Sequence, residues 1–174
     1  VESAVENLQR QGLKDIYVAN LNSPRQVVLS GTATALDVAE EALKKEGARR
    51  VVRLNVAGPF HSPLVQAAAD EFAEILNKTD FKQGHTSIFS NVTAKVIRDA
   101  SEARSLALRQ ITEPVRWSDE EQAIAKTVES AAARALEVGP GKVLQGLWVD
   151  AVKDIPCFGA GTANNIDEIL GAIE

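Results

Sequence analysis

The feature that most constrains the fold is a sharp turn in the stretch VAGPFHSPL, at residues 56–64. The β-branched run at residues 51–56 predicts a strand before the turn, and apolar residues at helical spacing follow it. Gly58 and Pro59 force a change of direction between the two. His61 is therefore expected on a strand-to-helix turn, where a neutral imidazole is well placed for proton transfer near pH 7. This stretch alone favours a simpler interpretation, a helix-capping turn with a polar surface histidine.

The sequence before this turn predicts the order α-β-β-α-β. The predicted elements are a helix over residues 3–12, strands over 16–21 and 26–30, a helix over 34–46 and a strand over 50–56. Ser3 and Glu6 have the spacing of a capping box at the start of the first helix. The order is that of a ferredoxin-like β-α-β-β-α-β unit without its first strand. Because that gap would leave backbone groups unpaired, we expect further sequence upstream of Val1.

Beyond His61 the pattern changes to alternating helices and strands. The predicted helices cover residues 64–78, 102–111, 117–128, 142–149 and 165–173, and the predicted strands cover 87–92, 133–138 and 155–160. Short apolar strands separated by helices predict an α/β fold with a parallel sheet covered on both faces. We therefore expect two units, residues 1–57 and residues 58–174. His61 would lie at the seam between them, where clefts commonly form.

Composition excludes several classes of function. The net charge of −5 argues against a nucleic-acid partner, and no apolar run is long enough to span a membrane. The single cysteine, Cys157, allows no disulfide within the chain. His61 and His85 lack the Cys or carboxylate spacing of a metal site, so no metal is expected. We expect a cytoplasmic monomer.

Three polar patterns have simple structural interpretations. GPGK at residues 139–142 lacks the spacing of a phosphate-binding P-loop and favours a close-packed strand-to-helix turn. Asn20 and Asn22 are predicted on the same side of a strand end, where both could cap the turn. Glu120 and Glu121 have the pattern of an exposed helix face.

A local basic cluster stands out in this acidic chain. Its members are Lys44, Lys45, Arg49, Arg50 and Arg53. Positive charge at the end of a helix is favoured by the helix dipole, so a solvated helix end explains the cluster without a partner.

Five stretches, in one order, resemble the malonyl-CoA:acyl carrier protein transacylase family, which also supplies acyltransferase domains of polyketide synthases. They are ANLNSPRQVVLSG (residues 19–31), VAGPFHSPL (56–64), SNVTA (90–94), RQITEPVRW (109–117) and EVGPGKVLQGL (137–147). Each motif is weak alone, but five in family order across essentially the whole chain are specific.

The resemblance implies an α/β-hydrolase-like core, here its C-terminal part, with a ferredoxin-like subdomain inserted. It also implies transfer of a malonyl group from coenzyme A to the phosphopantetheine thiol of acyl carrier protein, through an acyl-serine. Malonyl-CoA would be the substrate and no cofactor would be required. Acyl carrier proteins are acidic, so the basic cluster would be a docking face for this partner.

The resemblance also assigns roles to five residues. His61 would be the catalytic base, and the main-chain carbonyl of Gln110 would orient its ring. Asn20 and Asn22 would line the cleft near the acyl-pantetheine, and Phe60 resembles the Phe of malonyl-selective acyltransferases.

The residues themselves give a physical reason for the role of Gln110. Pro114 lies four residues further on and has no N–H, so the Gln110 carbonyl has no helical partner. We predict a distance of roughly 2.7–3.2 Å from His61 Nδ1 to the Gln110 oxygen.

The chain departs from the family in one large respect. The serine motif G-x-S-x-G occurs nowhere in the 174 residues, and the family's malonyl-binding Arg and oxyanion-hole donors also belong to the part preceding these motifs. Three interpretations stay open: the C-terminal portion of a malonyl transacylase of fatty-acid or polyketide synthesis, a non-catalytic scaffold that binds carrier protein, or a different α/β transferase with a similar architecture.

Overall fold

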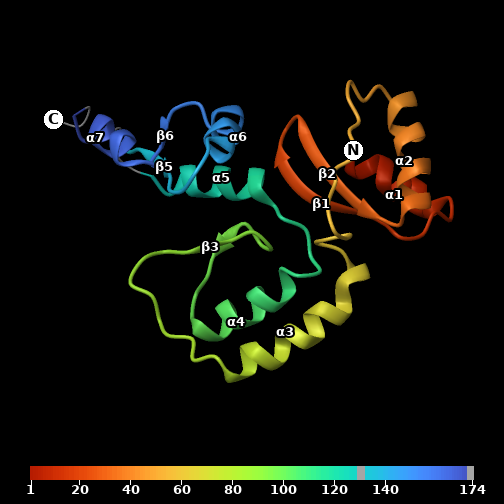
Figure 1. The fold of residues 1–174 in the computed structure, drawn as a ribbon, viewed down its shortest axis with the longest axis horizontal. Helices are drawn as coiled ribbons and strands as arrows, with labels where there is room; N and C mark the ends of the chain where they lie inside the picture. Colours follow the sequence, from red (N-terminus) through yellow and green to blue (C-terminus); the bar gives the residue numbers. More distant parts are fainter. Residues whose placement is uncertain (129–131, 172–174) are drawn as a thin grey trace.

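The computed structural model describes residues 1–128 and 132–171 (Figure 1). The chain is an α/β protein with strands paired two by two. Its elements are α1 (Glu2–Arg10), β1 (Ile16–Ser23), β2 (Gln26–Gly31), α2 (Ala33–Lys45), the 3-10 turn η1 (Pro63–Val65), α3 (Gln66–Lys78), β3 (Phe89–Ser90), β4 (Lys95–Val96), α4 (Ala100–Arg109), α5 (Trp117–Lys126), β5 (Ala135–Glu137), α6 (Val143–Ala151), β6 (Cys157–Gly159) and α7 (Ala163–Gly171). The end of the last predicted helix, at residue 173, lies outside the described residues.

The first four elements form a small layer of two helices against an antiparallel hairpin. β1 and β2 pair along their length, and α1 and α2 lie beside them (Figure 1). Val5, Ile16, Ala35 and Ala39 form the buried core between helices and strands. The predicted capping box is wrong, because α1 begins at Glu2 and no side chain caps it. Ser3 therefore lies inside the first turn.

The strand predicted at residues 50–56 is also wrong. This segment forms no strand, and the side chains of Val52, Leu54 and Val56 are 54–59% exposed. A β-branched sequence becomes a strand only when a neighbouring strand pairs with its backbone, and none lies beside this segment in the described part of the chain. Local strand propensity therefore did not suffice to make this segment a strand.

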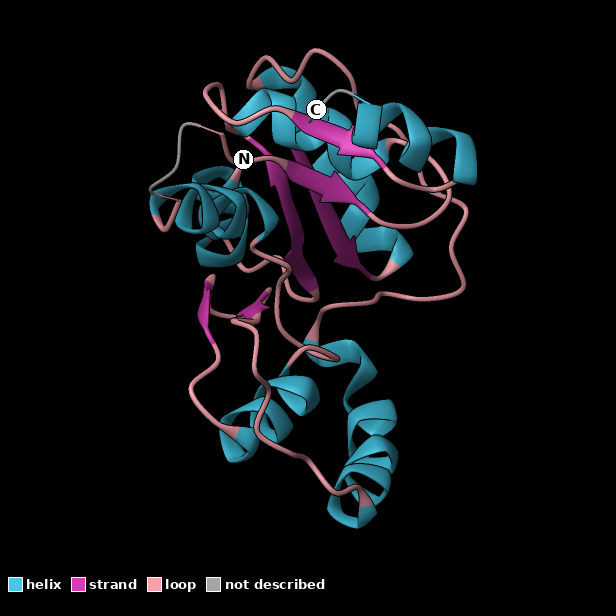
Figure 2. Ribbon diagram, turned by 90° about the vertical axis from the view of Figure 1, so that its left-hand side faces the viewer, coloured by secondary structure: helices cyan, strands magenta, loops and turns pink. Residues whose placement is uncertain are grey.

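The rest of the chain contains a helical pair and a short parallel sheet. α3 packs on α4, and the pair is set apart from the long strands (Figure 1 and Figure 2). β5 and β6 pair in parallel, as predicted for the strands at 133–138 and 155–160. The strand predicted at 87–92 is wrong in extent and pairing, because β3 turns back onto β4 as an antiparallel hairpin. Among the described helices, none combines the length and apolar character needed to cross a membrane.

A backbone bridge joins the hairpin to the segment after α4. The Leu21 N–H donates to the Val115 carbonyl at 2.8 Å, and the Val115 N–H donates to the Ala19 carbonyl at 2.8 Å. Two bulges in β1, at Val18/Asn20 and Leu21/Ser23, flank the contact. The edge of β1 that does not face β2 is thereby fixed to Val115, five residues after Gln110.

Glu120 and Glu121 are buried, so the prediction of an exposed helix face is wrong. α5 packs against β1, β3 and α6, which leaves Glu120 6% and Glu121 0% exposed. Neither carboxylate oxygen of Glu121 has a hydrogen-bond partner among the residues described. Burial raises the pKa of Glu121 to about 7, and the charges of Glu120 and Asp150 add to this shift. The nearby Trp117 side chain opposes it, although the indole N–H is outside hydrogen-bond geometry.

This pKa predicts that the chain loses stability as the pH rises. The unfolded chain releases the Glu121 proton near pH 4.5, whereas the folded chain keeps it up to about pH 7. The contribution of the protonated Glu121 carboxyl to the free energy of unfolding is therefore fully present below pH 4.5. It should be lost as the pH rises through 7, by roughly 3 kcal/mol at about 1.4 kcal/mol per pKa unit. Glu121→Gln should flatten this slope, measured by urea unfolding between pH 4.5 and 8.5.

The matched control is Glu71→Gln, which removes an exposed carboxyl from α3. It should leave the slope as in the unmodified chain. An equal slope in the Glu121→Gln variant would show that Glu121 does not cause the pH dependence.

Candidate active site

The turn that carries His61 is held in an uncommon backbone conformation. The φ angle of His61 is +55°, in the left-handed region that non-glycine residues rarely adopt. The Phe60 N–H donates to the Gly58 carbonyl at 3.0 Å, a γ-turn around Pro59. The Ser62 hydroxyl is fully buried and donates to the Pro59 carbonyl at 2.6 Å. Such conformations persist only where surrounding contacts impose them, and they concentrate at functional sites.

The ring of His61 is held by the end of α4. Its Nδ1 lies 2.9 Å from the carbonyl oxygen of Gln110, which confirms the predicted distance. A carbonyl can only accept a hydrogen bond, so Nδ1 carries the proton and Nε2 is left with a free lone pair. The Gln110 amide nitrogen lies 3.5 Å from the same Nδ1, too far for a strong hydrogen bond. The Gln110 backbone therefore fixes the tautomer that a proton acceptor requires.

Arg109 and Glu113, which lie on either side of Gln110 in the sequence, form an ion pair. Arg109 Nε and Nη2 donate to the two carboxylate oxygens of Glu113 at 2.6 and 2.9 Å, and these hydrogen bonds raise the pKa of Arg109. The Glu113 carboxylate is therefore engaged by Arg109 rather than by His61. Sequence reasoning did not identify Glu113, although its i,i+4 spacing from Arg109 was a readable signal.

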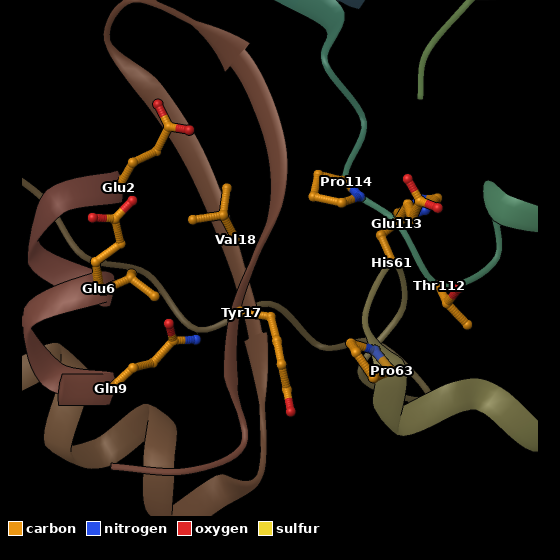
Figure 3. A pocket seen from close by; sticks show the side chains of 11 residues that line it. Glu2, Glu6, Gln9, Tyr17, Val18, His61, Pro63, Thr112, Glu113 and Pro114 are labelled. Carbon is orange, nitrogen blue, oxygen red and sulfur yellow. The ribbon is translucent and has the colours of Figure 1, made fainter. Parts of the chain in front are cut away.

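A cavity of about 350 Å³ opens beside His61 (Figure 3). It lies between α1, the first residues of β1, the His61 turn and the loop after α4. The lining residues are Glu2, Val5, Glu6, Gln9, Tyr17, Val18, His61, Pro63, Thr112, Glu113 and Pro114. Its volume is within the range of small-molecule sites. No group of three potential metal ligands occurs among the described residues.

The three remaining predicted residues do not line the cavity. Asn20 and Asn22 are half-buried in β1, and neither lines the cavity. The two bulges interrupt the alternation that predicted both amides on one side of the strand. Phe60 precedes His61 directly, and its side chain is 52% exposed.

The fold and the site define an α/β protein with a tautomer-fixed histidine beside a cavity. The sequence profile of the acyl transferase domain family matches residues 1–169. The chain therefore belongs to the acyl transferase domain family, as the resemblance implied.

Curated relatives are consistent with this assignment. The malonyl CoA-acyl carrier protein transacylase of Bacillus subtilis is 39% identical over 132 residues, which cover 76% of this chain and 41% of that protein. The Haemophilus influenzae protein of the same name is 32% identical over 158 residues, covering 89% of this chain and 50% of that protein. The chain thus spans about half the length of the curated relatives it matches.

Solved structures share the fold. The malonyl-CoA:acyl carrier protein transacylase of Xanthomonas oryzae superposes with a TM-score of 0.89 at 31% identity, over 98% of this chain and 54% of that one. A malonyl-transacylase solved in complex with its holo type II polyketide synthase acyl-carrier protein gives a TM-score of 0.88 at 31% identity, over 98% of this chain and 55% of that one.

The geometry predicts that Pro114 protects the His61 hydrogen bond. Pro114→Ala introduces an N–H that can compete for the Gln110 carbonyl. Loss of about 1 kcal/mol should shift the His61 tautomer ratio roughly fivefold toward Nε2–H, readable from the imidazole ¹⁵N shifts.

Gln110→Ala is the discriminating comparison, because it keeps the carbonyl and removes only the amide. The tautomer should then stay as in the unmodified chain. A shift as large as that of Pro114→Ala would identify the side-chain amide, not the carbonyl, as the partner of Nδ1.

Proposed function

We propose that this chain supplies the catalytic histidine and half of the cleft of a malonyl-CoA:acyl carrier protein transacylase. The hydrogen bond from His61 Nδ1 to the Gln110 carbonyl, in a member of the acyl transferase domain family, is the observation that carries the proposal. Malonyl-CoA would be the donor substrate, with no cofactor. We place the reaction in fatty-acid or polyketide synthesis in the cytoplasm.

In the proposed mechanism, His61 Nε2 takes the proton of a serine hydroxyl as its oxygen attacks the malonyl thioester carbonyl. The C–S bond then breaks, and the imidazolium returns the proton to the departing coenzyme A thiolate. The second half runs in reverse, with the phosphopantetheine thiol of acyl carrier protein as the attacking group. These 174 residues contain no G-x-S-x-G serine, so the proposal assigns the nucleophile to the matching remainder of the family fold.

We also propose roles for the two parts of the chain and for the other site residues. We assign residues 1–57 to a ferredoxin-like subdomain and residues 58–174 to the C-terminal part of an α/β-hydrolase-like core, acting as a monomer. Asn20 and Asn22 would contact the acyl-pantetheine, and Phe60 would contribute to malonyl selectivity. The exposed Phe60 side chain is available for such a contact.

The direct test uses a complete enzyme, in which the upstream portion of the Bacillus subtilis relative is joined to this chain. His61→Ala should lower the rate of carrier-protein malonylation by roughly 10²–10⁴-fold, the usual contribution of a general base. His85→Ala is the matched control, because His85 is the other histidine and is exposed. The 174-residue chain alone should give no transfer, since it lacks the serine.

Mass spectrometry of the carrier protein separates the alternatives. A His61→Ala enzyme with a near-normal rate would remove His61 from the mechanism. Binding of carrier protein without any malonylation by the complete protein would instead support a non-catalytic scaffold.

The basic cluster predicts how the carrier protein docks. Lys44 and Arg53 are already paired with Glu40, and Arg53 also with Asp37. No ion pair engages Arg49 or Arg50 in the described part of the chain, and both are exposed. Arg49→Glu combined with Arg50→Glu should therefore raise the KM for acyl carrier protein severalfold and leave the KM for malonyl-CoA unchanged.

Lys95→Glu is the control for net charge, because Lys95 is exposed on β4, outside the cluster. It should change neither KM. Equal effects of the arginine variant on both substrates would count against docking at this face.

A further inference from the structure

A serine hydroxyl far from His61 in sequence holds the peptide that precedes this residue. Ser30, in β2, donates from its Oγ to the Phe60 carbonyl at 2.5 Å. Ser30 is 8% exposed and lies opposite Tyr17 in the hairpin. The hydrogen bond therefore ties the His61 turn to the β1–β2 hairpin, whose strands pair along their length.

The Phe60 carbonyl belongs to the peptide plane that ends at the nitrogen of His61. Rotation of this plane about the N–Cα bond is the φ angle of His61, which is +55°. The Ser30 hydroxyl is fixed in β2, so its hydrogen bond opposes rotation of this peptide plane toward the negative φ angles that most residues adopt. The other end of the residue is held by the Gln110 carbonyl on Nδ1, at 2.9 Å. Backbone and ring are thus fixed from two separate elements.

A second serine acts one peptide earlier. Ser62 is fully buried, and its Oγ donates to the Pro59 carbonyl at 2.6 Å. Both carbonyls that precede His61 therefore accept a hydroxyl hydrogen bond. The Ser62 bond stays within the turn, so it can shape the turn but cannot orient it relative to the hairpin. The Ser30 bond, by contrast, reaches from the turn to the hairpin.

We propose that Ser30 is a positioning residue for His61, which sets the direction of the imidazole by clamping the Phe60 carbonyl to β2. The catalytic consequence rests on the proposed function of His61 as a base. The structural claim does not, because it concerns the ring orientation in this chain. Ser30 touches no reacting atom in this arrangement and acts through the peptide of His61.

The first experiment measures the imidazole ¹⁵N and ¹H spectra of the 174-residue chain, which has only two histidines. Ser30→Ala should move the His61 signals toward a tautomer mixture, because the Nδ1 contact with Gln110 loosens. The His85 signals should not move. Ser23→Ala is the matched control: Ser23 is a 4% exposed serine of the same hairpin, whose Oγ accepts from the Arg25 N–H at 3.3 Å.

Two β-branched variants of Ser30 separate the effect of the hydroxyl from the effect of side-chain size. They also provide a test if the Ser30→Ala variant does not fold. Ser30→Thr keeps an oxygen that can donate to Phe60, whereas Ser30→Val replaces it with a methyl group of similar size. Only the valine variant should shift the His61 tautomer. His61 spectra that are identical in Ser30→Thr and Ser30→Val would overturn the proposal, as would an unchanged spectrum in folded Ser30→Ala.

Kinetics of the complete enzyme give the second readout. Ser30→Val should lower kcat roughly 10- to 100-fold relative to Ser30→Thr, with little change in KM, as expected for a misplaced catalytic group. An equal kcat in the two variants would overturn the catalytic part. A tautomer shift in an enzyme that transfers no malonyl group would uphold the positioning of His61 and refute only the proposed function.

Discussion

The backbone bridge between β1 and Val115 is the contact on which the site depends. It joins the hairpin to the loop after α4 through two hydrogen bonds of 2.8 Å. Gln110 lies five residues before Val115, so the bridge fixes the Gln110 carbonyl relative to the hairpin. Ser30 fixes the His61 turn relative to the same hairpin. Both partners of the His61–Gln110 hydrogen bond are therefore held by the same hairpin, which favours a reproducible distance between them.

The parts of the site that were predictable from sequence depend on local chemistry. Pro114 removes the one helical donor that the Gln110 carbonyl would otherwise meet, and this follows from spacing alone. Gly58 and Pro59 similarly indicate the turn before His61. The family motifs supplied the pairing of His61 with Gln110, which lie 49 residues apart. Ser30 could not be identified in this way, because its contact with Phe60 depends on the path of the turn over the hairpin.

The fold shows the same division between local and tertiary information. Most helices lie within a few residues of their predicted bounds, because their apolar spacing is periodic over several turns. Residues 50–56 have strong strand propensity but pair with no strand in the described part of the chain, and most of them are exposed. Glu120 and Glu121 are charged residues of the kind usually found on a protein surface. They are nevertheless buried, because β1, β3 and α6 pack against α5. Propensity describes a residue, whereas pairing and burial depend on what the rest of the chain places beside it.

The charges around the cavity explain how the proposed work is divided within the complete enzyme. Glu2, Glu6 and Glu113 line it, and no Lys or Arg is among its lining residues in the described chain. Glu113 is already paired with Arg109, but a malonyl carboxylate placed there would lie near the exposed carboxylates of Glu2 and Glu6, which is unfavourable without a cationic partner. In the proposed mechanism, this wall would therefore serve proton transfer by His61 rather than binding of the anionic acyl group. In the proposed transacylase, the cation that binds the malonyl carboxylate has to be supplied from outside this cavity wall, and acyl selectivity arises only when both walls of the cleft are assembled.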